Sequence, residues 1–72
     1  MTVFDRLKEI CDSKMVNRVI VLLDSRSDFV EWCFLYDLRR GYYQFNEDYT
    51  KMKLTEEKHY TKDGDQCISL QV

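Results

Sequence analysis

The stretch VNRVIVLLDSRSDFVEWCFLYDL, residues 16–38, decides the fold of this 72-residue chain. Its first part is rich in β-branched residues and its last part in aromatic ones, which favours two strands at about residues 16–23 and 29–38. The polar run Asp24-Ser-Arg-Ser-Asp28 between them is typical of a turn. Residues 29–38 also fit a buried helix, because the spacing of the apolar side chains there does not choose between the two periods.

Both predicted strands are apolar on both faces. Val19, Val21 and Leu23 alternate with Ile20 and Leu22 in the first strand. An antiparallel sheet with one wet face alternates apolar and polar residues, and one short helix cannot cover two apolar faces. We therefore expect the second face to meet another copy of the chain in a homodimer. In the second strand, Phe29, Cys33 and Leu35 lie opposite a face that carries Val30, Trp32, Phe34, Tyr36 and Leu38. The expected dimer interface is formed by Trp32, Phe34 and Tyr36.

The flanking sequence completes an α+β domain over residues 1–72. Residues 2–12 are predicted to be a helix, with Thr2 as the N-cap and Asp5 three residues later as in a capping box. Further strands are predicted at about 42–45, 49–54 and 66–72, and the fourth strand has a possible extension to residue 61. The Asp63-Gly64 pair indicates a hairpin turn before the last strand. The predicted fold is a short N-terminal helix packed on a four- to five-stranded antiparallel sheet.

The charged residues are dense but nearly balanced, with 11 basic and 13 acidic side chains and a formal net charge of −2. This balance excludes a protein that binds nucleic acid through general basic charge. The N-terminus has no apolar run typical of a signal peptide. The longest unbroken apolar stretch, Val19–Leu23, is too short to span a membrane. We therefore expect the chain to act in the cytosol.

The residues that commonly bind metals or perform catalysis are few. Cys11, Cys33 and Cys67 are odd in number and far apart, and His59 is the single histidine. Structural zinc sites use close-spaced pairs of Cys or His, and a disulfide framework uses an even number of cysteines. We therefore expect three reduced, buried thiols, with no metal and no cofactor. Any catalytic triad would have to use His59, which lies in a charged segment, and there is no glycine-rich phosphate loop. The sequence favours a protein that is not an enzyme.

One segment suggests nucleic-acid binding. Arg39-Arg40-Gly41-Tyr42-Tyr43-Gln44-Phe45 places basic residues before aromatic ones, as on sheets that bind RNA by phosphate contacts and base stacking. Its Arg-Gly-Tyr opening is similar to the signature strand of the RNA-recognition motif, but Tyr43 departs from the Gly or Ala of that motif. The competing interpretation is a hairpin turn that leads into core aromatic residues.

The acidic residues suggest a different function. If the strands run up and down in sequence order, alternate turns share an end of the sheet. One end then collects Asp24, Asp28, Glu47 and Asp48, and most of the basic turn residues collect at the other end. Rows of carboxylates can take the place of DNA phosphates in the basic site of a DNA-binding protein. The simpler interpretation is that these carboxylates keep an edge of the domain soluble.

In size, charge density and α+β character, the chain resembles small early proteins with which lytic phages of Gram-positive bacteria disable host machinery, some of them DNA mimics. Its −2 charge departs from the strongly acidic DNA mimics of that kind. The resemblance implies a dimeric protein in the bacterial host cytosol that inhibits or modulates a host protein, in its most specific form a basic nucleoid-type protein. The alternatives are a nucleic-acid-binding module that uses the Arg39–Phe45 hairpin and a structural subunit of a larger assembly.

Overall fold

The N-terminal helix α1 spans Val3–Asp12 in a computed structural model that describes all residues 1–72. The Thr2 hydroxyl accepts the Asp5 backbone N–H at 3.1 Å, and the Asp5 carboxylate accepts the Thr2 N–H at 3.0 Å. The predicted helix and its capping box are therefore confirmed. Leu7 and Ile10 are buried on its inner side, as the apolar periodicity of the sequence requires.

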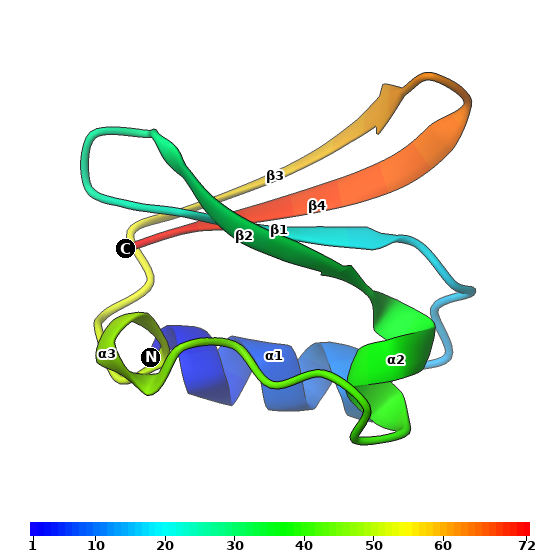
Figure 1. Cartoon of the computed structure of the whole chain (residues 1–72), viewed down its shortest axis with the longest axis horizontal. Helices are drawn as coiled ribbons and strands as arrows, with labels where there is room; N and C mark the ends of the chain where they lie inside the picture. The colour runs from blue at the N-terminus through cyan, green and yellow to red at the C-terminus, as the bar shows by residue number, and fades with distance from the viewer.

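The four strands form one mixed sheet with the order β2-β1-β4-β3. They are β1 (Val19–Leu23), β2 (Phe29–Phe34), β3 (Glu56–Lys62) and β4 (Asp65–Gln71). β1 is antiparallel to β2 but parallel to β4, and β3 is antiparallel to β4. The prediction of an all-antiparallel sheet is wrong, and the strands do not have the sequence order on which the grouping of the acidic turns is conditional. The chain leaves β2 at one edge, crosses through the helical layer and returns at the opposite edge, which makes the two central strands parallel (Figure 1).

The strand predicted at 29–38 ends at Phe34, and helix α2 (Leu35–Arg39) follows it directly. The pairing of β1 with β2 ends at Val19 and Phe34. Asn17 Oδ1 accepts the Tyr36 N–H at 2.8 Å and ties the start of α2 to the segment before β1. Leu35 is fully buried there, so the apolar residues after Phe34 pack as a helical turn.

Two other predicted strands are absent. Residues 42–45 cross the helical layer without joining the sheet, because the Glu31 carboxylate holds them beneath β2. It accepts the Tyr43 hydroxyl at 2.8 Å and the Asn46 N–H at 3.1 Å. Residues 49–54 contain the end of helix α3 (Glu47–Thr50), whose N-cap is the Asn46 side chain.

The remaining predicted bounds shift by smaller amounts. The strand expected at 16–23 begins at Val19, and the strand expected at 66–72 spans Asp65–Gln71. The suggested continuation of the fourth strand to residue 61 corresponds to β3. The predicted Asp63-Gly64 turn joins β3 to β4, with φ values of 52° and 84° that suit a two-residue hairpin loop.

All three helices lie on one face of the sheet (Figure 1). The inner face contributes Ile20 and Leu22 of β1 together with Ile68 and Leu70 of β4, and each of these side chains is at most 1% exposed. They pack with the inner side of α1 in a single hydrophobic core. The prediction of a short N-terminal helix packed on the sheet is therefore confirmed, with α2 and α3 as additional cover.

We predict that Ile68→Ala lowers the free energy of unfolding by about 3 kcal/mol, because it empties a fully buried site in the central strand. Trp32→Ala should cost only about 1 kcal/mol, because the Trp32 side chain is 45% exposed on the opposite face. Urea denaturation of both variants measures this difference. An equal loss of stability in the two variants would contradict the assignment of inner and outer faces.

An ion pair fastens α1 to the outermost strand. The Arg6 guanidinium donates to both carboxylate oxygens of Glu57, at 2.6 and 2.9 Å. His59 Nε2 lies 2.6 Å from the same carboxylate. The hydrogen bonds from Arg6 lower the pKa of Glu57 below its ordinary value, and His59 contributes in the same direction. The charged pair is therefore a contact between the two layers at the edge of the core.

The Arg6–Glu57 contact predicts a pH dependence of stability. A carboxylate with a lowered pKa in the folded state stabilises the fold above its unfolded pKa, and this contribution is lost as the pH falls through the folded pKa. We expect the wild type to lose about 1 kcal/mol more than Glu57→Gln between pH 7 and pH 3. Urea denaturation of both proteins across this range measures the difference. Asp5, whose pKa is also lowered, titrates in both proteins, so its contribution cancels in the comparison. Identical pH profiles would contradict the prediction.

Candidate docking surface

The face of the sheet that points away from the helices is not covered by any other element (Figure 1). It carries several large apolar side chains. We call this surface the outer face. Phe29, Trp32, Phe34 and Tyr60 on it are 60%, 45%, 39% and 40% exposed. The prediction that the strands are apolar on both faces is confirmed for β1, where Ile20 and Leu22 are buried and Val19, Val21 and Leu23 are half-buried.

The outer face carries a hollow beside the β3–β4 hairpin. A shallow depression of about 390 Å³ lies between β2, β1 and the β3–β4 hairpin. Trp32 and Phe34 form one wall, with ring centroids 5.1 Å apart and the rings nearly perpendicular at 89°. This edge-to-face pair is a favourable aromatic geometry and holds the two rings in defined positions. The depression is lined by Val19, Val21, Phe29, Trp32, Phe34, Tyr60 and Cys67, with Lys62, Asp63 and Asp65 at its rim.

A β-bulge determines which residues of β2 reach the outer face. The pairing of β1 with β2 shifts between Leu22 and Leu23. Phe29 therefore lines the outer depression together with Trp32, whereas Val30 packs against the core. Strict alternation predicts the opposite placement of Phe29 and Val30. That prediction is wrong because a bulge adds one residue to the strand and reverses the alternation beyond it.

The three residues predicted to form a dimer interface are not all on one strand. Trp32 and Phe34 share the outer face as expected. Tyr36 instead lies in α2, where its ring stacks under the Arg40 guanidinium at 4.8 Å and its hydroxyl accepts a hydrogen bond from Arg40. The chain bends into a helix after Phe34, so a strand periodicity cannot place Tyr36.

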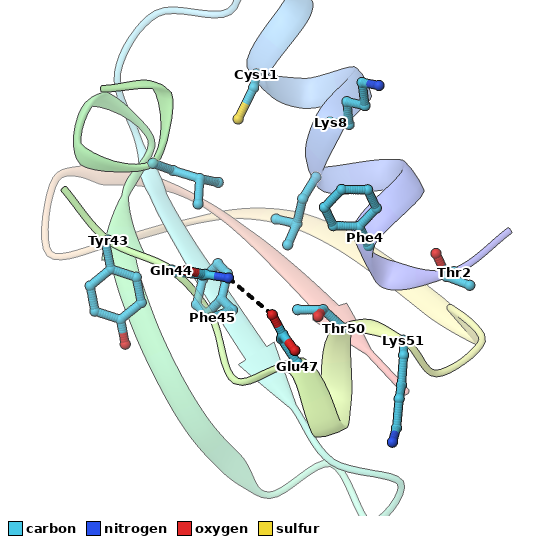
Figure 2. A pocket seen from close by; sticks show the side chains of 12 residues that line it. Thr2, Phe4, Lys8, Cys11, Tyr43, Gln44, Phe45, Glu47, Thr50 and Lys51 are labelled. Carbon is cyan, nitrogen blue, oxygen red and sulfur yellow. Dashed lines mark hydrogen bonds between the residues drawn. The ribbon is translucent and has the colours of Figure 1, made fainter. Parts of the chain in front are cut away.

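A second hollow lies in the helical layer, between α1 and the segment 43–51 (Figure 2). It is an open groove of about 690 Å³. Phe4 is 58% exposed beside it. The amide of Gln44 donates to the Glu47 carboxylate at 3.3 Å across one side. The amino groups of Lys8 and Lys51 point away from the groove in Figure 2. The Gln44 amide and the Glu47 carboxylate, which point toward each other in Figure 2, bind one another and are not directed together at a ligand.

The four carboxylates predicted to bind a partner belong to two elements. Asp24 and Asp28 lie in the turn between β1 and β2, and Glu47 and Asp48 lie in the first turn of α3. These elements are at the same end of the molecule but in different layers (Figure 1). Asp24 Oδ1 also accepts the backbone N–H of Arg26 and of Asp28, at 2.8 and 3.0 Å. This carboxylate therefore stabilises its own turn.

The predicted Arg39–Phe45 hairpin does not form, and Arg39 has a structural position. Its guanidinium donates to the carbonyls of Cys11, Ser13 and Met15 at 3.0, 2.9 and 2.7 Å. It reaches the Ile10 carbonyl at 3.4 Å as well. These carbonyls belong to the C-terminal end of α1 and the loop after it, where a helix leaves acceptors without partners and where positive charge is favourable. The sequence carries no local signal for this contact, because Arg39 is 24 or more residues away from its partners.

The aromatic residues of the same segment are divided between core and surface. The Tyr43 and Phe45 rings pack edge to face at 5.3 Å, and Phe45 is buried. Tyr42 remains 71% exposed, beside Arg40 at 5.5 Å. The interpretation of this segment as core aromatic residues after a turn is thus correct for two of its three aromatic side chains.

The cysteines and the histidine occupy separate places. Cys33 and Cys67 are buried and Cys11 is half-buried, and all three are free thiols. Burial raises the pKa of Cys33 to about 12, which keeps its thiol protonated and unreactive. No group of three or more His, Cys, Asp and Glu side chains is arranged to hold a metal ion. His59 is half exposed, and its ring has Glu57 as its hydrogen-bond partner.

Comparisons with protein families, with curated proteins and with solved structures find no match to this chain. None of its helices has the length and apolar character needed to cross a membrane.

The contacts of Arg39 predict a difference between two neighbouring arginines. Arg39→Ala should lower the free energy of unfolding by about 2 kcal/mol, because several carbonyls after α1 lose a charged donor. Arg40→Ala should change it by less than about 0.5 kcal/mol, since the Arg40 guanidinium contacts only the exposed side chains of Tyr36 and Tyr42. Urea denaturation of the two variants is the measurement. Comparable stability of both would show that the Arg39 contacts do not support the fold.

Proposed function

We propose that this protein is a small non-enzymatic binding protein and that its outer face contacts another protein. The observation that carries this proposal is the one-sided arrangement of the domain. Helices cover one apolar face of the sheet, and the other face leaves four large aromatic side chains 39–60% exposed. Contiguous apolar patches of this kind on small proteins mark sites of interaction.

The composition of the outer face suits a protein partner. Aromatic residues are enriched at the centres of protein interfaces, and Trp and Tyr contribute disproportionately to binding energy. The rim carries both signs of charge, with Lys62 beside Asp63 and Asp65. An apolar centre with a mixed polar rim matches the usual anatomy of a protein interface. A nucleic-acid site, in contrast, would require a predominantly basic rim.

Two features support a non-enzymatic role, one on the outer face and one on the helical side of β3. The depression on the outer face is shallow and open, and its lining contains no pair of a nucleophile and a hydrogen-bonded base. The Glu57 carboxylate beside His59 is held by Arg6, which keeps it ionised as a structural contact. We propose that the partner is a protein of the cell in which the chain acts and that binding inhibits or modulates it.

The test is affinity capture with matched surface variants, with and without nuclease. We expect Trp32→Ser to weaken capture of a protein partner by about tenfold or more, because it removes a central aromatic anchor. Phe4→Ser, which removes a similarly exposed aromatic residue from the opposite layer, should leave capture unchanged. The chain has one tryptophan, so the fluorescence of Trp32 should shift to the blue when the captured partner is added.

A different pattern would support the DNA-mimic hypothesis. In that case, neutralising Asp28, Glu47 and Asp48 to Asn, Gln and Asn would abolish capture of a basic protein, and Trp32→Ser would not. Asp24 is left unchanged in this variant, because its carboxylate holds the turn. Loss of capture on nuclease treatment would support direct nucleic-acid binding and contradict our proposal.

A further inference from the structure

The two edges of the sheet differ in their protection. The β2 edge carries a β-bulge and passes directly into α2, both of which oppose pairing with another strand. The β3 edge is a regular seven-residue strand without a bulge or proline. β4 is the one element against which β3 packs extensively, and β3 is the last strand in the sheet order. β3 therefore presents an unpaired edge of backbone donors and acceptors.

The hydrogen bonds of β4 determine which groups face this open edge. The Val72 N–H donates to the Leu23 carbonyl of β1 at 3.2 Å. Successive residues of a strand direct their N–H and C=O groups to opposite sides, so Gln71 and every second residue before it face β3. Glu56 is opposite Gln71 and thus faces β4. The free backbone groups along the edge are those of residues 57, 59 and 61.

We infer that β3 pairs antiparallel with β3 of a second copy, about a two-fold axis at His59. In this register the edge-facing groups of His59 meet those of His59 in the other copy, and Glu57 meets Thr61. All free backbone groups of both edges then find partners. On the outer face, Glu56 lies opposite Lys62 of the other copy and Lys58 lies opposite Tyr60. The two-fold axis makes each of these pairs occur twice.

The charges of β3 select this register against its neighbours. Shifts by two residues are the smallest that keep the two outer faces on the same side of the sheet. One such shift places Lys58 opposite Lys58 of the second copy. The opposite shift places Lys58 opposite Lys62 and Glu57 opposite Asp63. Like charges directly across a strand pair are destabilising, whereas opposite charges and cation–aromatic pairs stabilise it.

The contacts now made by these side chains do not prevent the pairing. Lys58 Nζ and Glu56 Oε1 are 3.6 Å apart within one chain, but both side chains are more than half exposed. Such a surface pair contributes little and rearranges readily. Glu57 is held from below by Arg6 on the helical side, so its contact lies off the strand edge. The free edge is therefore both unpaired and complementary to itself.

The consequence is a continuous eight-stranded sheet with all helices on one side. The outer faces of the two copies then form one surface of twice the width, with the two Tyr60 rings near its centre. The use of this wider surface for binding rests on the proposed function of the outer face, whereas the pairing of β3 does not. Because a single strand pair buries less than the roughly 800 Å² per partner of a standard interface, we expect a reversible dimer in the micromolar range.

The test is sedimentation velocity over a concentration series from about 1 to 500 μM, a range that brackets such an interface. The wild type should convert reversibly from monomer to dimer. Glu56→Lys alone and Lys62→Glu alone should each weaken the dimer about tenfold, because each creates two like-charge pairs. The double variant that combines both substitutions should restore it. A wild type that stays monomeric, or a double variant weaker than either single one, would overturn the inference.

A covalent test reports the register. His59 is the residue that faces itself across the proposed axis, at about the 5.5 Å Cα separation of a hydrogen-bonded antiparallel pair, which a disulfide can span. His59→Cys should therefore form a cross-linked dimer under mild oxidation, and Thr61→Cys should not. Trp32→Ser is the control for the outer face and should dimerise like the wild type. Loss of the dimer in Trp32→Ser with retention in Glu56→Lys would show instead that the copies meet through the outer face.

Discussion

The burial of Ile20 and Leu22 beneath the helical layer is the interaction on which the rest of the structure depends. Both side chains lie on β1, which is hydrogen-bonded on both sides and is therefore the strand that links the β1–β2 hairpin to β4. Helix α1 packs over both side chains. Its N-terminus is capped by the Thr2–Asp5 capping box, and Arg39 binds carbonyls at its C-terminal end. A chain of 72 residues buries a smaller fraction of its surface on folding than a larger domain does, so its helices are available to cover only one face of the sheet.

The uncovered outer face and the unpaired β3 edge are consequences of that constraint. The three helices occupy one face of the sheet, so the side chains that alternate with the core residues of β1 and β2 remain in contact with water. A mixed sheet of four strands likewise leaves two edges open. A small domain often completes its burial by association. In this protein the outer face and the β3 edge are the two surfaces that we propose for such contacts, and they are physically separable.

Several charged residues that suggest a function in the sequence support the fold instead. The sequence around Arg39 predicts a basic, aromatic hairpin, yet Arg39 binds carbonyls at the end of α1 and in the loop after it. Asp24 belongs to an acidic turn and holds that turn by accepting two backbone N–H groups. Glu57 lies in a charged segment and binds Arg6 across the two layers. Arg39 and Glu57 bind groups that only folding brings close, which is why charge patterning alone does not reveal their contacts, whereas Asp24 binds N–H groups two and four residues away in its own turn.

The sequence by itself determined the α+β class, the capped N-terminal helix, the first hairpin and the Asp63-Gly64 turn, because local spacing and turn chemistry specify these features. It also indicated two apolar faces and thereby placed Trp32 and Phe34 on the outer one. The tertiary structure alone decided the parallel pairing of β1 with β4 and the helical fold of residues 35–39. Strand order and the course of a crossover depend on contacts between distant residues, and hydrophobic periodicity carries no information about such contacts.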